Sequence, residues 1–401
     1  MMDTYPIKGQ TISSLELKCE LVVDGIRLHP SAQEGVGTQY KEQVHSLFDF
    51  DEDFHSDELF PAELSLSDGT MLLFKQVSSS KYLLRREDGE LFLEREGERM
   101  AEVRYSPRPR FYDQLNAEGI PMSRVGQTVD NRCVTFCLSN YCDYFRTHDQ
   151  CRFCNIVPTK GTYGAELVGR KRARQIAEVT AAAVEEGAAN KFNLTGGVFP
   201  EHKEIDHYVE VMETVREAVN GNLVGANATI AAVDPRDARR LKAAGFTTAA
   251  MNLEVWDKNL FAGICPGKAR TVGWQRWTER LEAAVEIFGK GNVRCVFVSG
   301  LESKSAFLEG ADFLASRGIY VIAIPWNPGP GSMLQGHRSP TPAWHFDLQE
   351  RLAEINDRHG FRIDCLRDSP FIFLLMCYDF WARHLFKVGR GVEVFPRPSL
   401  S

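Results

Sequence analysis

The most constraining feature of the sequence is a regular alternation, starting near residue 130, of short apolar runs and longer segments with helical periodicity. The apolar runs predict six strands, at residues 133–139, 191–195, 222–226, 247–253, 293–299 and 319–324. The segments after them predict six helices, at residues 166–187, 203–219, 233–244, 269–289, 303–317 and 342–358. Six strand–helix units without a reversal favour an α/β fold with a partial (β/α)6 TIM-like barrel over an open sheet. In either fold, ligands bind at the C-terminal ends of the strands.

The flanking segments have a different pattern. Residues 63–77 and 82–96 alternate apolar and polar side chains around Ser-Asp-Gly and Glu-Asp-Gly turns, which is typical of β-hairpins. We therefore expect an N-terminal β-rich domain at residues 1–125, a core barrel at 126–340 and a C-terminal helical extension at 341–401.

The charge balance argues against nucleic acid or a membrane as a partner. The chain of 401 residues carries 47 basic and 54 acidic residues, a formal charge of -7, so no global field attracts polyanions. The first residues lack a signal-peptide pattern, and the longest apolar stretch is too short to cross a bilayer. We expect a soluble, cytoplasmic protein with reduced cysteines.

Five of the ten cysteines fall within 22 residues, namely Cys133, Cys137, Cys142, Cys151 and Cys154. The first two lie in an expected strand, and the last three follow it on one loop at the edge where ligands bind. A loop with three thiolates can wrap an iron–sulfur cluster and leave one iron without a protein ligand. The alternative is a structural zinc site formed by Cys133, Cys137, Cys151 and Cys154 in a zinc-stabilised α/β binding protein.

The segment SNYCDY, an insertion and then QCRFCN resembles the cluster motif of radical SAM enzymes. The usual spacing in that superfamily is C-x3-C-x2-C, whereas this chain has C-x8-C-x2-C. Longer first intervals also occur there, as in the catalytic subunit of Elongator. The resemblance implies that Cys142, Cys151 and Cys154 ligate a [4Fe-4S] cluster that also binds S-adenosyl-L-methionine. Cys137 is the alternative first ligand.

Further residues at the expected strand ends fit this resemblance. Thr195, Gly196 and Gly197 follow the second strand and resemble the GGE motif, whose backbone holds the methionine amino group, although Val198 replaces the glutamate. Phe153 precedes the last cysteine, where the resemblance implies packing against the adenine. Additional candidates for contacting S-adenosyl-L-methionine lie at the ends of strands three to five, and they are Asn227, Glu254 and Ser299.

The resemblance implies a 5'-deoxyadenosyl radical that abstracts hydrogen from a substrate. It also implies an electron donor such as flavodoxin or ferredoxin. The net negative charge makes a small molecule the expected substrate rather than a nucleic acid. Cys265 is a candidate for a catalytic thiol, and the alternative is a buried cysteine at a helix end. An ordinary barrel hydrolase or lyase lacks support, because the sequence has no H-x-H pair or H-E-x-x-H motif.

Overall fold

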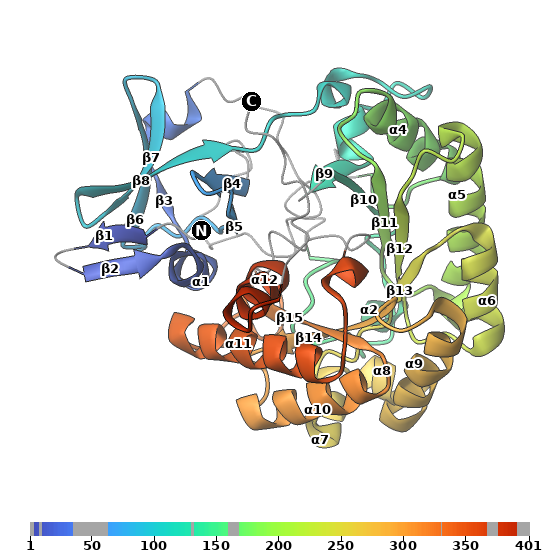
Figure 1. Ribbon diagram of the computed structural model, residues 1–401. Helices are drawn as coiled ribbons and strands as arrows, with labels where there is room; N and C mark the ends of the chain where they lie inside the picture. Colours follow the sequence, from blue (N-terminus) through green and yellow to red (C-terminus); the bar gives the residue numbers. More distant parts are fainter. Residues whose placement is uncertain are drawn as a thin grey trace.

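The computed structural model describes residues 4–7, 10–34, 63–129, 132–158, 168–329, 331–366 and 376–390. Two larger sheets organise these residues, one in the N-terminal third and one in the remainder of the chain, with helices around the second (Figure 1). Among the described residues, no helix is long and apolar enough to cross a membrane.

The larger sheet is a partial barrel. Six parallel strands follow the chain order, from β10 (Cys133–Cys137) through β11 (Lys191–Thr195), β12 (Gly225–Thr229), β13 (Thr248–Ala250) and β14 (Val293–Ser299) to β15 (Tyr320–Pro325). Strand β9 (Gln127–Val129) pairs antiparallel with β10 at one edge. In the described ranges β9 and β15 are the two edges of the sheet and do not pair. The predicted fold class is confirmed.

Helices cover the outer face of this sheet (Figure 1). They are α4 (Ala173–Glu185), α5 (Glu204–Val219), α6 (Pro235–Ala244), α9 (Trp274–Phe288), α10 (Lys304–Ser316) and α11 (Pro342–Arg358). Helix α11 begins where predicted, because the Thr341 hydroxyl accepts a hydrogen bond from the Trp344 amide and Pro342 fills the first helical position. Three short helices were not predicted, namely α2 (Asp143–Arg146), α7 (Lys258–Ile264) and α8 (Pro266–Thr271).

Several predicted boundaries are wrong: the strand expected at 247–253 covers only Thr248–Ala250, and the helix expected from residue 269 starts at Trp274. Two further errors have local reasons. The third strand was expected at residues 222–226 but starts at Gly225, because Asn220 ends α5 in a left-handed conformation and the chain is still turning there. The first helix was expected from residue 166 but starts at Ala173. Arg170 forms a bridge with Ser139, so the described residues before the helix are extended.

The N-terminal sheet contains six strands in the order β3 (Arg27–Leu28), β6 (Tyr82–Glu87), β7 (Glu90–Arg95), β8 (Glu98–Tyr105), β4 (Glu63–Leu66) and β5 (Met71–Leu73). The two predicted hairpins are present as the antiparallel pairs β4–β5 and β6–β7. A separate hairpin, β1 (Thr4–Ile7) with β2 (Gln10–Ser13), leads into helix α1 (Ser14–Asp24), which the β-rich expectation did not include.

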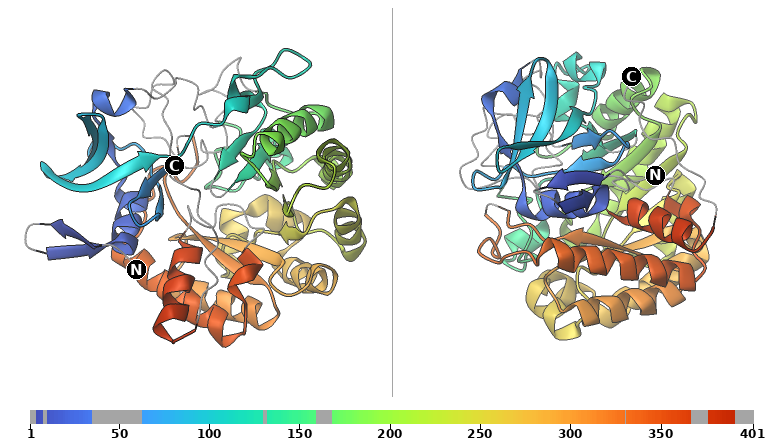
Figure 2. Two further views of the ribbon diagram at one scale, coloured as in Figure 1. Left: turned by 45° about the horizontal axis from the view of Figure 1, so that its top comes forward. Right: turned by 60° about the vertical axis from the view of Figure 1, so that its left-hand side comes forward.

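Helix α1 connects the two ends of the chain. It packs against α11 and lies beside α12 (Cys377–Lys387), as the right-hand view of Figure 2 shows. The buried Lys18 ammonium lies 2.6 Å from the Asp379 carboxylate. A small apolar cluster surrounds this junction and consists of Leu15, Cys19, Met376 and Phe380. We call these residues, with Lys18 and Asp379, the α1–α12 junction.

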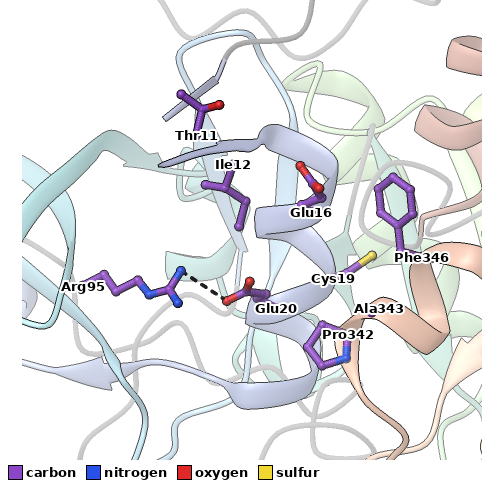
Figure 3. A pocket seen from close by; sticks show the side chains of 9 residues that line it. All are labelled: Thr11, Ile12, Glu16, Cys19, Glu20, Arg95, Pro342, Ala343 and Phe346. Carbon is purple, nitrogen blue, oxygen red and sulfur yellow. Dashed lines mark ion pairs between the residues drawn. The ribbon is translucent and has the colours of Figure 1, made fainter. Parts of the chain in front are cut away.

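A cavity of about 350 Å³ lies next to this junction, between α1 and the start of α11 (Figure 3). Its walls include Glu16 and Glu20 from α1, Arg95 from β7, and Phe346 from α11. Arg95 approaches Glu20 to 3.7 Å. Glu20 also accepts a hydrogen bond from the Tyr82 hydroxyl, so its carboxylate is tied to the N-terminal sheet.

Candidate active site

A second cavity, of about 260 Å³, opens at the C-terminal ends of the parallel strands. Each of the strands from β10 to β15, or the segment that directly follows it, contributes to its wall. The predicted site residues among its lining are Cys142, Cys151, Phe153, Cys154, Thr195, Gly196, Gly197 and Glu254. The fold therefore brings together most of the candidates at the edge where a barrel binds its ligands.

Hydrogen bonds to the next strand fix the start of the cysteine loop. The Leu138 amide donates to the Thr195 carbonyl at 2.7 Å, and the Gly197 amide donates to the Ser139 carbonyl at 2.9 Å. The Asp143 amide then donates to the Val198 carbonyl at 2.8 Å. The chain on both sides of Cys142 is thus held against the end of β11.

The two glycines after β11 pack closely against this loop, and the second leaves no room for a side chain. A Cβ atom at Gly197 would lie 2.1 Å from the Tyr141 carbonyl oxygen and 2.8 Å from the Cys142 Cβ. A Cβ at Gly196 would lie 3.1 Å from the Ser139 amide nitrogen. The sequence prediction was a close approach of the backbone to a ligand. In the structure the close neighbour is the cysteine loop itself, so the glycines set the position of Cys142.

The three loop cysteines are free thiols of intermediate exposure. Burial raises the pKa of Cys142 and of Cys154. A hydrogen bond from Cys265, and also the charge of Lys268, lower the pKa of Cys151. Cys151 is therefore the loop thiol whose surroundings most favour the thiolate, the form that binds metal.

Cys133 and Cys137 lie in β10, and the structure keeps both buried. The Cys137 thiol donates to the Ser139 carbonyl, and neither cysteine lines the cavity. The cavity thus contains Cys142 and not the alternative Cys137. The four cysteines of the zinc alternative are not gathered at one point either. In the described ranges, no three His, Cys, Asp or Glu side chains are placed to hold one metal ion. Cysteines that bind different irons of a cluster need not meet at one point.

Glu254 lies at the cavity because the regular hydrogen bonding between β13 and β14 is interrupted just before it. After β13, the Val296 amide donates to the Asn252 side chain, and regular pairing resumes when the Glu254 amide donates to the Val296 carbonyl. Glu254 has a positive φ of 75°, which is unusual for a residue other than glycine. Its carboxylate accepts a 2.6 Å hydrogen bond from Lys268.

Lys268 is the site residue that sequence reasoning missed. Its ammonium also donates to the Asn252 carbonyl at 2.8 Å, and it lines the cavity with the cysteines. Burial alone would lower the pKa of Lys268, but the Glu254 carboxylate and the Cys151 and Cys265 thiols together raise it above its usual range. The available signal was its position three residues after Cys265, in the segment C-P-G-K.

Three other candidates lie outside the lining of the cavity. The Asn227 amide is buried and donates to the Asn193 side chain within the barrel, while Thr229 of the same strand reaches the cavity. Ser299 is buried 3.4 Å from the His345 ring. Cys265 is fully buried beside Cys151 and is not part of the wall. The structure therefore places Cys265 behind a candidate cluster ligand.

No family model matches the chain. Among curated proteins, it is 28% identical over 264 residues to bacteriochlorophyllide c C-7(1)-hydroxylase from Chlorobaculum limnaeum. This match covers 62% of the chain and 65% of that protein, so the chain spans slightly less than two thirds of this relative's length.

Solved structures similar to the chain include three enzymes of different function. Coproporphyrinogen III oxidase HemN from Escherichia coli, described as a radical SAM enzyme, is 13% identical, with 63% of this chain and 58% of that chain covered and a TM-score of 0.39. A radical SAM methyltransferase from Sphaerobacter thermophilus is 17% identical, with 71% and 76% covered and a TM-score of 0.40. The FeFe-hydrogenase maturase HydG from Carboxydothermus hydrogenoformans is 18% identical, with 57% and 52% covered and a TM-score of 0.45. None of these three likenesses exceeds 18% identity or a TM-score of 0.45.

Proposed function

We propose that this protein is a radical SAM enzyme whose cluster is ligated by Cys142, Cys151 and Cys154. The observation that carries the proposal is that these three free thiols line one cavity with the Thr-Gly-Gly turn at the C-terminal edge of the half-barrel. Three thiol ligands suit a [4Fe-4S] cluster that keeps one iron open for S-adenosyl-L-methionine. These residues would hold the cluster, which when bound and reduced would supply the electron for cleavage of S-adenosyl-L-methionine into methionine and a 5'-deoxyadenosyl radical.

The residues of this chain would bind and orient the cofactor pair. The Thr195–Gly197 backbone and the Glu254 carboxylate offer acceptors for the amino group and hydroxyls of S-adenosyl-L-methionine, and Phe153 offers an apolar face. Strands β12, β14 and β15 and the segments after them add an apolar wall to the same cavity, made of Ile230, Ala231, Val296, Val298, Ile324 and Trp326. An apolar wall excludes water, which protects a reactive intermediate from side reactions.

We propose a small molecule as the substrate, attacked at a C–H bond presented to this apolar wall. Support for oxidation at carbon comes from the curated relative, whose name describes a hydroxylase acting on bacteriochlorophyllide c. Hydroxylation of a bacteriochlorophyllide is therefore the first reaction to test, with S-adenosyl-L-methionine accepting two electrons as it is cleaved to methionine and 5'-deoxyadenosine, and water supplying the oxygen. A low-potential electron donor such as flavodoxin or ferredoxin completes the proposal.

The test is anaerobic reconstitution with iron and sulfide, followed by dithionite and S-adenosyl-L-methionine. Iron content and 5'-deoxyadenosine are measured for the wild type, Cys142→Ala and Cys137→Ala. Cys137 is the matched control, because it lies in the same segment but does not line the cavity. We expect about four irons per chain in the wild type. Formation of 5'-deoxyadenosine is expected to be lost in the Cys142 variant and kept in the Cys137 variant.

Two results would contradict the proposal in different ways. Loss of 5'-deoxyadenosine only in the Cys137 variant would keep the chemistry and assign the first ligand to β10. Tightly bound zinc, with no cleavage of S-adenosyl-L-methionine by the wild type, would refute the radical reaction and favour the zinc-stabilised binding protein.

A further inference from the structure

Lys268 is held rigidly at the wall that carries the cysteines. Its ammonium donates to the Glu254 carboxylate at 2.6 Å and to the Asn252 carbonyl at 2.8 Å. It also lies 5.0 Å from the centre of the Trp277 ring, within the range of a cation–π contact. The two side chains of the ion pair are only 12% and 10% exposed, so solvent screens this charge weakly.

The segment that carries Lys268 is attached to the cysteine loop by its backbone. The Arg152 amide donates to the Ile264 carbonyl at 2.8 Å, and the Gly267 amide donates to the Asp149 carbonyl at 2.8 Å. Gly267 leaves no room for a side chain, because a Cβ there would lie 2.5 Å from the Tyr144 ring. The α7–α8 segment and the cysteine loop therefore form one packed unit, with Lys268 at a fixed place beside Cys151.

We propose that Lys268 is a positioning residue that sets the reduction potential of the cluster held by the loop. This inference rests on the proposed function. Reduction adds a negative charge to the cluster, so a fixed positive charge at the cavity wall stabilises the reduced form and raises the potential. Glu254 partly offsets this effect through its own negative charge. The two members of the ion pair thus have opposite effects on the reduction potential of the cluster.

Removal of either charge is expected to shift the reduction potential, and the two shifts have opposite signs. A merely structural role of the ion pair would not predict opposite shifts. In K268M the ratio of reduced to oxidised cluster at a fixed potential is expected to fall about tenfold, a shift of about 59 mV to lower potential. In E254Q the potential is expected to move in the other direction. K268R retains the charge and should restore most of the wild-type value.

The measurement is a redox titration of the reconstituted full-length protein, without S-adenosyl-L-methionine, followed by the electron paramagnetic resonance signal of the reduced cluster. K258M is the matched control, because Lys258 is an exposed lysine at the start of α7 that contacts the Trp274 ring. Its potential should equal that of the wild type. The melting temperatures of all variants identify any that fail to fold. If K268M fails to fold, the potentials of K268R and E254Q are compared instead.

Outcomes separate this inference from the proposed function. A wild-type protein that binds no iron–sulfur cluster overturns the proposed function and this inference with it. If the wild type binds a cluster and both K268M and E254Q have the same reduction potential as the wild type, this inference alone is overturned. Shifts of both variants in the same direction also overturn it, because they would report a general disturbance of the loop.

Discussion

Two lysine–carboxylate pairs of equal length occupy very different surroundings in this protein. Lys268 and Glu254 are 2.6 Å apart at the wall of the candidate active site, and Lys18 and Asp379 are 2.6 Å apart in the α1–α12 junction. The first pair faces a cavity with three thiols, and its side chains are about one tenth exposed. The second pair is exposed by 0% and 3% and lies next to the apolar cluster of the junction.

The difference shows how one chemical pair can serve two purposes. Charges beside an open cavity act on whatever enters it, whereas charges in a closed junction act only on the two segments that carry them. A buried pair is a weak source of net stability but is costly to break. We therefore expect changes around Glu254 to alter chemistry and changes around Lys18 to alter stability.

The strongest test of this contrast is Gly197→Ala. The added methyl group would overlap the Tyr141 carbonyl, so the cysteine loop must move away from β11. A displacement of about 1 Å can lower a reaction rate by about 100-fold, and we expect such a loss in 5'-deoxyadenosine formation. Gly336→Ala is the control, because a Cβ at Gly336 meets no atom within 4 Å. Equal activity of the two variants would mean that the position of Cys142 is not critical.

Lys18→Met probes the other region. It leaves the Asp379 carboxylate buried without the ammonium 2.6 Å away, and we expect the free energy of unfolding to fall by about 3–5 kcal/mol. Urea denaturation measures this loss. The double variant K18M/D379L should recover much of it, since both charges are then removed. Iron content of the folded K18M protein should match the wild type, and a loss of iron would break the separation between the two regions.

His345 links stability to pH in helix α11, which packs against α1 and α12. Burial, assisted by the charge of Lys304, lowers the pKa of His345 to about 4. The neutral ring lies between Ser299 and Ser339. In the unfolded chain His345 becomes protonated near pH 6.5, whereas in the folded protein it stays neutral down to about pH 4. The contribution of the neutral ring to the free energy of unfolding is therefore complete above pH 6.5 and is lost as the pH falls toward 4. The total is roughly 3 kcal/mol.

Urea denaturation of the wild type and His345→Gln between pH 7 and pH 4 tests this expectation, with the two curves compared at each pH. The variant should lose stability less steeply over this range. Parallel curves would show that His345 does not titrate as its burial requires.

The smallest expected effect is at the first turn of α1. The Ser13 hydroxyl accepts a hydrogen bond from the Glu16 amide, and the Glu16 carboxylate accepts one from the Ser13 amide. Ser13→Ala should lower the free energy of unfolding by about 1 kcal/mol and leave iron content unchanged. Thermal denaturation beside an iron assay measures both. A loss as large as that of Lys18→Met would mean that the helix end, not the ion pair, holds the junction.

Much of the barrel could be predicted because its signals are local. The strand at 293–299 and the helix at 342–358 match the structure in both bounds, since each is a contiguous run with clear ends. The preference for Cys142 over Cys137 also followed from local position, because one residue lies inside a strand and the other beyond its end. Helix α1 was missed even though Ser13 and Glu16 form a capping box that is visible in the sequence.

The missing parts depend on long-range folding. Lys18 and Asp379 are 361 residues apart, and no local pattern pairs them. Lys268 reaches the cavity only because α8 packs beside the cysteine loop and β13 is interrupted before Glu254. Asn227 was expected at the strand end, but β12 continues to Thr229, so Asn227 remains inside the barrel.

The backbone of Glu254 sets a limit on how far this protein can be stabilised. Holding a glutamate at a φ of 75° costs about 1–2 kcal/mol of folding free energy, because the left-handed region suits glycine and not larger residues. Glycine at this position would relieve that cost. Glu254→Gly would also remove the carboxylate that holds the little-exposed Lys268 ammonium, and breaking such a pair costs more than the strain that glycine relieves. The ion pair therefore keeps the strained backbone in place, and heat resistance cannot be gained at this position.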